Sequence, residues 1–271
     1  DQPRSRGLGD VYKRQPQEIF FYRFLIAYIG IWAISPKHLF ADNLKDELWL
    51  VAGGVFGGSL YFFTENTALG ITQASNVAFI ICTAPLLTTI LSLIFYKSEK
   101  ATKGLIYGSL LALIGVGLVV FNGSVVLKLS PVGDLLTLLA ALSWAFYSLV
   151  IKRMTGRYPT VFITRKIFFY GVLTILPAFL LHPLQPDFDV LLQPLVLSNL
   201  LFLAVLASLI CYILWNVVLK QLGTMRASNY IYLNPLVTMV ASVLILHEQI
   251  TWITLMGAAC IILGVYLAEK K

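Results

Sequence analysis

Ionisable side chains occur inside long apolar segments of this sequence, at Arg23, Glu65 and Arg165. A charge within a membrane span is costly, so it is a candidate for substrate or ion recognition by default. Glu65 could carry a proton or attract a cationic substrate, and its neighbour Asn66 could form hydrogen bonds. A water-exposed carboxylate is an equally good interpretation of Glu65, and both arginines could instead extend to the lipid headgroups.

A second set of candidates combines aromatic rings with amides in the later part of the sequence. Tyr230 and Asn234 are four residues apart, as are Tyr212 and Asn216, so each pair shares one face of a helix. Such faces suit a pocket for a partly apolar metabolite that forms hydrogen bonds. Aromatic belts and contacts between helices are the alternative. The predicted substrate-binding residues are Trp144, Tyr147, Tyr212, Asn216, Tyr230, Asn234, Arg23, Glu65 and Asn66.

Two prolines, Pro85 and Pro235, fall in the middle of apolar segments. Each removes an amide donor and frees the carbonyl group four residues earlier, at Ile81 and Ile231. At membrane depth, an unpaired carbonyl is tolerated only where protein or a water-filled cavity satisfies it. We therefore expect a helix kink at each proline and a central cavity beside them, although a packing kink without a ligand is the alternative.

No arrangement of residues predicts catalysis or metal binding. The three cysteines and three histidines are isolated from one another, without the spacing of a zinc site or a disulfide framework. Serine, histidine and acidic residues do not converge in the sequence as a catalytic triad would require. We expect no catalytic residue, no metal and no cofactor.

The amino-acid composition indicates the class of protein that contains these side chains. Hydrophobic residues make up 58% of the 271 residues and charged residues only 12%, whereas soluble domains contain about 25% charged residues. The mean hydropathy of +0.82 agrees with this excess. The sequence therefore predicts an integral membrane protein in contact with lipid. Its net charge of +7 comes from dispersed basic residues, which indicates membrane topology and not a nucleic-acid partner.

Nine segments are candidates for spanning helices, each of which needs roughly 20 largely apolar residues. Membrane strands would alternate in polarity every second residue, and these runs do not, so we expect an all-α membrane protein. The predicted helices cover residues 16–35, 48–69, 74–96, 103–121, 132–152, 163–182, 197–219, 226–246 and 250–268.

Lysine and arginine residues divide unevenly between alternate loops of these helices. One side carries only Lys128. Because loops rich in Lys and Arg remain in the cytoplasm, we expect a multi-pass protein of the cell (inner) membrane with a cytoplasmic C-terminus. The loop at 152–162 would be cytoplasmic and the loop at 183–196 external. The basic residues of the predicted cytoplasmic side are Lys37, Lys45, Lys97, Lys100, Lys103, Lys152, Arg153, Arg157, Lys220, Arg226, Lys270 and Lys271.

The sequence also contains an internal repeat. Residues 64–96 align with 214–246 at an offset of 150, and one residue then drops out. The matched pairs are Arg23 with Arg165, Asn66 with Asn216, Pro85 with Pro235, Leu86 with Leu236, Thr88 with Thr238, Ser92 with Ser242, Glu99 with Glu248, Thr102 with Thr251, Gly108 with Gly257, and Gly115 with Gly264.

This repeat predicts one copy at 16–121 and another at 132–268. The helix at 132–152 has no counterpart, so we expect a parent fold of five plus five helices whose first helix is missing here. An odd number of helices per copy inverts the second copy in the membrane, the plan of many secondary transporters with substrate near the repeat interface. Residues 1–15 are too few to span a membrane as a helix, and we expect them to be a non-native or disordered segment.

The repeated pattern Pro…Glu-x-x-Thr…Gly-x6-Gly resembles the EamA-type transporters of the drug/metabolite transporter superfamily. The stretch PQEIFFYRFLIA (16–27) is similar to the second helix of that family, with Arg23 at its arginine position, and 133–154 is similar to the sixth. The resemblance implies ten helices, cytoplasmic termini and transport of small metabolites, commonly export.

We therefore expect a secondary transporter that moves a small-molecule substrate by alternating access. An amino acid or related compound is one candidate substrate, and export is the expected direction. An intramembrane enzyme and a non-transporting membrane structural protein are the alternatives. The enzyme would need paired carboxylates or a nucleophile with its base at matching depth, and the structural protein would not need repeat-paired prolines. The sequence does not specify an oligomeric state.

Overall fold

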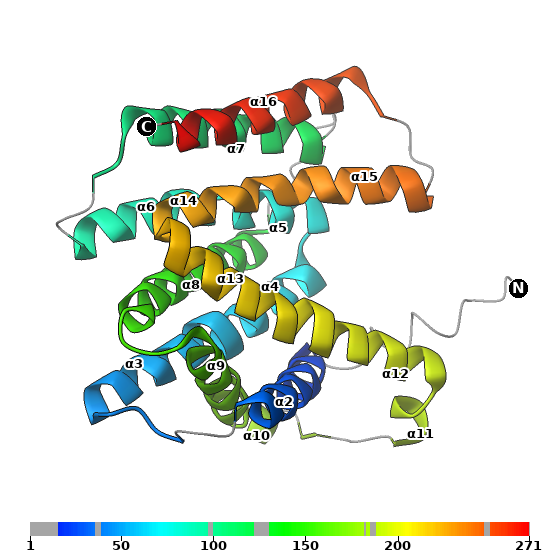
Figure 1. The fold of residues 1–271 in the computed structure, drawn as a ribbon. Coiled ribbons are helices and arrows are strands. Elements are labelled where there is room, and N and C mark those ends of the chain that lie inside the picture. The colour runs from blue at the N-terminus through cyan, green and yellow to red at the C-terminus, as the bar shows by residue number, and fades with distance from the viewer. Residues whose placement is uncertain are drawn as a thin grey trace, which may run out of the picture. The chain divides into compact units, whose positions relative to one another are not determined.

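A computed structural model describes residues 16–35, 39–96, 100–121, 130–181, 183–184, 188–246 and 250–270. All regular elements within these residues are helices, and no strand occurs among them (Figure 1), which confirms the predicted helical class. In the part of the chain that the structure describes, seven helices are long and apolar enough to cross a membrane: Gln17–Ile34, Ala74–Phe95, Lys103–Phe121, Pro131–Thr155, Thr160–Leu180, Pro194–Leu222 and Trp252–Glu269. The count of nine remains a prediction. Residues 1–15, Lys128 and the motif residues Glu99 and Glu248 lie outside the described part of the chain.

The chain divides into two compact units. Unit 1 consists of Asp1–Phe63 with Val150–Lys220, and unit 2 of Thr64–Leu149 with Gln221–Lys271. Each unit thus combines a segment of the first predicted repeat with a segment of the second. The helices α4 (Leu60–Ile71), α8 (Pro131–Thr155) and α13 (Cys211–Leu222) each cross from one unit to the other.

In unit 1, α9 packs against α2, α3 and the π-helical turn η1, while α2 also packs against the π-helical segment η2. A Cβ atom placed on Gly54 would lie 2.9 Å from the amide nitrogen of Gly171, so the two backbones meet because Gly54 has no side chain. The unit contains α2 (Pro16–Ile34), α3 (Leu44–Gly54), η1 (Val55–Ser59), α9 (Thr160–Ile175), α10 (Ala178–Leu181), α11 (Phe188–Leu191), α12 (Pro194–Leu201) and η2 (Phe202–Ile210), with parts of α4, α8 and α13.

A buried carboxylate joins the start of α3 to the loop that follows α8. Asp46 is 1% exposed, and both of its oxygens accept from Nη1 of Arg157 at 2.9 Å. The hydroxyl of Tyr158 donates to it at 3.1 Å, and the side chain of Asn43 donates to it at 2.9 Å. Burial alone would raise the pKa of Asp46, but these hydrogen bonds and the charge of Arg157 outweigh it and hold that pKa below its usual range.

This lowered pKa predicts a loss of stability in acid. A carboxyl group with a depressed folded-state pKa stabilises the fold above its unfolded pKa, and the stabilisation disappears as the pH falls through the folded value. We expect Asp46→Asn to lower the thermal unfolding midpoint at pH 6, and the difference from wild type to shrink below about pH 4. Thermal unfolding in detergent between pH 3 and pH 6 measures this. Asp189→Asn, at an exposed acidic residue, is the control; an equal effect at both positions would contradict the prediction.

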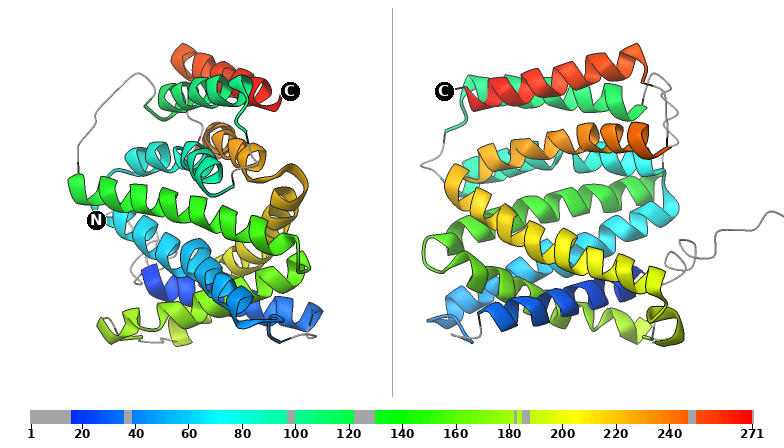
Figure 2. Two further views of the ribbon diagram at one scale, coloured as in Figure 1. Left: turned by 90° about the vertical axis from the view of Figure 1, so that its left-hand side faces the viewer. Right: turned by 45° about the vertical axis from the view of Figure 1, so that its right-hand side comes forward.

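Unit 2 contains the antiparallel pair α7 and α16, which lie side by side in both views of Figure 2. A Cβ atom on Gly115 would lie 2.6 Å from the carbonyl oxygen of Gly257, and a Cβ on Gly264 would lie 2.6 Å from that of Gly108. The two backbones are therefore in direct contact at four glycines. The unit comprises α5 (Ala74–Ile81), α6 (Ala84–Phe95), α7 (Lys103–Phe121), α14 (Thr224–Asn229), the 3-10 turn η3 (Tyr230–Leu233), α15 (Asn234–Leu246) and α16 (Trp252–Glu269), with parts of α4, α8 and α13.

Candidate binding pocket

Unit 2 contains an open cavity of about 580 Å³, within the range of small-molecule sites. Its walls come from α4, α5, α7, α15 and the start of α16. Most of the lining is apolar, and the polar side chains are few. The lining residues are Glu65, Leu69, Ala74, Ser75, Val77, Ala78, Ile81, Cys82, Val119, Val120, Asn234, Pro235, Thr238, Met239, Val243, Ile250 and Thr254.

Breaks in two helices shape the walls of this pocket. Helix α5 ends at Ile81, and α6 begins at Ala84 with Pro85 in its first turn, where a residue without an amide hydrogen is tolerated. The hydroxyl of Thr83 donates to the carbonyl of Ile80 at 2.7 Å and so satisfies one backbone acceptor at the break. Cys82, within the break, lines the pocket.

The second break precedes Pro235. The chain passes from α14 through the 3-10 turn η3 before α15 begins at Asn234. Asn234 and Thr238 are then one helical turn apart, and both line the pocket. Each proline thus follows an interruption in its helix, but Pro235 lines the cavity whereas Pro85 is buried outside its lining.

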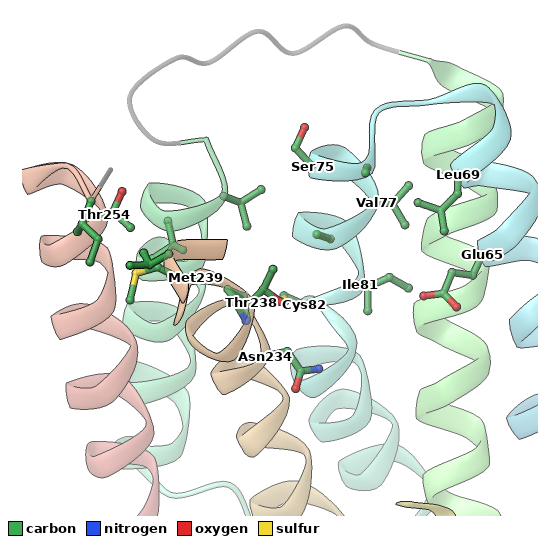
Figure 3. Close-up of a pocket in the computed structure, with 17 residues that line it drawn as sticks. Glu65, Leu69, Ser75, Val77, Ile81, Cys82, Asn234, Thr238, Met239 and Thr254 are labelled. Carbon is green, nitrogen blue, oxygen red and sulfur yellow. The ribbon is translucent and has the colours of Figure 1, made fainter. Parts of the chain in front are cut away.

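Glu65 is the only charged side chain among the described residues that line the pocket. Figure 3 shows the carboxylate of Glu65 and the amide of Asn234 extending from different walls of the cavity. Glu65 is half-buried on α4, whereas Asn234 is exposed to the open space at the start of α15. The pocket therefore combines apolar walls, a few hydroxyl and amide groups, and one carboxylate.

Three residues predicted from the sequence lie in this lining: Glu65, Asn234 and Pro235. Asn66, Trp144, Tyr147 and Tyr230 belong to the same unit but are not part of the lining. On α8, the ring centroids of Trp144 and Tyr147 are 5.1 Å apart and Tyr147 is fully buried. The side chain of Tyr230 is 38% exposed.

The other predicted residues lie in unit 1, where they connect helices. Arg23 donates through Nε to Ser208 Oγ at 2.8 Å, and its guanidinium lies 4.5 Å from the centroid of the Phe62 ring. The hydroxyl of Tyr212 donates to the carbonyl of Gly57. The amide of Asn216 donates to Thr164 Oγ1 at 2.9 Å. These polar groups therefore make contacts between helices of unit 1.

Several lining residues were not predicted from the sequence. Thr238 had a usable signal, because it follows the candidate Asn234 by one helical turn and matches Thr88 in the repeat. Ser75 and Thr254 are ordinary hydroxyl residues near the starts of their helices, and Leu69 and Met239 resemble any lipid-facing residue. Nothing in their identity distinguishes the wall of a pocket from a helix surface.

The described residues contain no group of three or more His, Cys, Asp or Glu side chains that could hold a metal ion. The pocket supplies one carboxylate and the buried thiol of Cys82. The arrangement suits binding of a small molecule.

Comparison with known proteins identifies relatives along nearly the whole chain. Residues 10–121 and 131–269 match the EamA-like transporter family. A protein of Archaeoglobus fulgidus named as an uncharacterized transporter is 27% identical over 260 residues, which cover 94% of this chain and 88% of the relative. The transporter YyaM of Bacillus subtilis, also named as uncharacterized, is 30% identical over 228 residues, which cover 80% of this chain and 70% of the relative.

A protein of Salmonella typhimurium named as a probable amino-acid metabolite efflux pump is 27% identical over 245 residues, covering 86% of this chain and 80% of the relative. One solved crystal structure has a TM-score of 0.75 at 18% sequence identity and covers 94% of this chain and 87% of the other. That likeness concerns the fold alone. The sequence matches, together with the membrane-spanning helices, show that this chain is a multi-pass membrane transporter of the EamA-like transporter family, within the drug/metabolite transporter superfamily, and not an enzyme.

Proposed function

We propose that this protein is a secondary transporter that carries a small metabolite across the cell membrane by alternating access, with the pocket of unit 2 as its substrate site. The observation that carries the proposal is a cavity of about 580 Å³ built into membrane-spanning helices of a transporter-family chain. Transport folds of this kind place substrate beside interrupted helices, and the breaks before Pro85 and Pro235 lie in helices of this unit.

The contact between α7 and α16 supports the proposed inverted repeat. The sequence pairs Gly108 with Gly257 and Gly115 with Gly264, whereas in space Gly108 meets Gly264 and Gly115 meets Gly257. Crosswise contact between equivalent positions is the pattern that a two-fold axis produces. Two copies that insert in opposite directions would be related by such an axis in the membrane plane. Nine spanning helices from a five-plus-five parent fold remain part of this proposal.

Two helix pairs of unit 2 that are equivalent in the repeat are packed differently. By the repeat alignment α5 corresponds to α14, and α6 to α15. Helices α6 and α14 are in contact, and the buried hydroxyls of Ser92 and Thr224 form a hydrogen bond of 3.0 Å. Helices α5 and α15 instead face each other across the pocket, through residues such as Ser75 and Thr238. Exchange of these two arrangements would close the pocket and open the other end, which is alternating access.

The charge distribution supports an orientation for this cycle. Ala74 and Thr254, which line the pocket, lie close to residues 72–73 and 250–251, which are outside the helices. The distribution of Lys and Arg in the sequence predicts that these segments lie outside and that the C-terminus lies in the cytoplasm. The structure, with its pocket open between α5 and α15, would then be an outward-open state. Since two relatives are named as probable amino-acid metabolite efflux pumps, export of an amino-acid metabolite is the first activity to assay.

Cysteine labelling checks the proposed orientation. In a background with the three native cysteines replaced by alanine, we expect Gly156→Cys to resist a membrane-impermeant maleimide in intact cells and to react after permeabilisation. Gln193→Cys should react in intact cells. Both positions are exposed, so burial does not limit either reaction. Labelling of Gly156→Cys but not Gln193→Cys in intact cells would reverse the topology.

Flux measurements test transport itself. We expect proteoliposomes that contain the protein and are preloaded with one amino-acid metabolite from a panel to accumulate the same labelled compound by counterflow, because a carrier exchanges its substrate without net driving force. Vesicles without protein are the control. No counterflow with any member of a panel of amino acids, amines and related metabolites would reject the transport proposal.

A further inference from the structure

The charge of the pocket in unit 2 constrains its ligand. Glu65 is the only lining residue with a charged side chain in the described part of the chain, and the lining on both sides is largely apolar, through residues such as Leu69, Ile81 and Met239. The carboxylate extends into the cavity (Figure 3). In such surroundings a carboxylate interacts more strongly with an opposite charge than it would in water. The site therefore favours a ligand with a positive group.

The other walls of the pocket indicate the chemistry of the uncharged part of the ligand. Val77, Ala78 and Ile81 on α5 line the cavity together with Met239 and Val243 on α15. Contact with these side chains removes apolar surface from water and favours a ligand with an apolar body. The cavity volume of about 580 Å³ admits a body of one aromatic ring with room for motion.

A free amino acid meets this description less well than an organic cation. Its ammonium and carboxylate groups are attached to the same carbon atom, so an ammonium group bound to Glu65 would bring the ligand's carboxylate close to the same residue. Like charges at that distance repel, and no lining residue described in the structure supplies a compensating cation. Hydroxyl and amide groups such as Ser75 and Asn234 can hydrogen-bond a carboxylate but leave the repulsion uncompensated.

We infer that the pocket of unit 2 selects organic cations, with an ammonium group bound by Glu65 and an apolar body held between α5 and α15. This inference rests on the proposed function in that it assigns a substrate class to the same pocket. It concerns binding, however, and binding can be measured without transport.

Measurement of the electrostatic field in the pocket tests the inference without a substrate. Leu69 lies one helical turn from Glu65, lines the pocket and is 44% exposed. In a background lacking the native cysteines, Leu69→Cys should react faster with a cationic than with an anionic methanethiosulfonate. After division by the ratio measured on 2-mercaptoethanol, we expect a rate ratio of about fivefold or more. Adding Glu65→Gln should bring that ratio close to one. A ratio near one with Glu65 present would overturn the inference.

Protection of the same cysteine tests ligand choice with three probes that share one apolar body. Phenethyltrimethylammonium is a permanent cation, phenylalanine is a zwitterion, and 3-phenylpropanoate is an anion. We expect the cation to slow alkylation of Leu69→Cys at a concentration roughly tenfold or more below that required of phenylalanine. The anion should not protect. Equal or better protection by phenylalanine or by the anion would overturn the inference, and so would protection by none of the three.

Variants of Glu65 distinguish an effect of its charge on ligand preference from an effect on folding. Glu65→Asp keeps the carboxylate and should retain the preference for the cation, whereas Glu65→Gln should lose it. Both variants should elute as monodisperse protein in detergent. Full cation preference in a folded Glu65→Gln variant would overturn the assignment. If Glu65→Gln does not fold, the retained preference of Glu65→Asp and the field measured around Leu69→Cys with Glu65 present decide the question.

Transport is scored separately in vesicles. Protection by the cation without counterflow of any compound would support the inference and reject the transport proposal. Counterflow of phenylalanine without a preference for the cation would reject the inference and retain the transport proposal.

Discussion

Replacement of Thr238 by tryptophan is expected to reduce counterflow to the level of vesicles without protein. Thr238 lines the cavity one helical turn after Asn234, and an indole ring at this position would occupy the space that the substrate needs. Filling the pocket should also prevent α5 and α15 from approaching each other, so the loss would affect both binding and the conformational cycle. Initial rates of labelled substrate accumulation in proteoliposomes measure this loss.

The adjacent residue on α15 provides a matched control. Val237 is 68% exposed and does not line the pocket, so Val237→Trp introduces the same ring into the same helix on another face. We expect this variant to retain most of the wild-type rate. Near-normal counterflow in Thr238→Trp, with equal amounts of reconstituted protein, would show that substrate does not pass through this cavity.

Substitution of the glycines at which α7 and α16 meet is expected to destabilise unit 2, and a large side chain there is expected to prevent its folding. A Cβ atom on Gly115 would lie 2.6 Å from the carbonyl oxygen of Gly257 and 2.7 Å from the amide nitrogen of Ile261. Because both neighbours are backbone atoms, no side-chain movement relieves the clash and the helices must separate. Overpacking in a well-packed core costs about 1–3 kcal/mol and sometimes more. We expect Gly115→Leu to abolish monodisperse protein in detergent, and Gly115→Ala to lower the thermal unfolding midpoint.

Gly70 is the matched control for this prediction. It lies on α4 in the same unit, and a Cβ atom there would have no neighbour within 4 Å. Gly70→Leu should therefore yield monodisperse protein with an unfolding midpoint close to that of wild type. Similar yields and midpoints for Gly115→Leu and Gly70→Leu would contradict close backbone contact between α7 and α16.

The candidate site was only partly predictable from residue types. Glu65, Asn234 and Pro235 line the pocket, and each had a clear signal: a charge, an amide or a proline within an apolar run. Tyr212 and Asn216 carried an equally good signal, yet their polar atoms join helices of unit 1. A polar group needs a partner at membrane depth whether that partner is a ligand or another helix. Its presence in the sequence therefore does not distinguish the two uses.

The sequence by itself determined that this chain is a helical membrane protein and a transporter of the EamA-like family. Apolar runs about as long as a bilayer is thick, without alternating polarity, favour helices that satisfy their own backbone hydrogen bonds, and the repeated motifs, such as Gly108…Gly115, resemble those of the family. Only the tertiary structure decided which side chains line the cavity. Whether Leu69, Ser75 or Met239 faces lipid, a neighbouring helix or open space depends on the rotation and separation of the helices, and those follow from contacts between distant segments, such as that of α7 with α16.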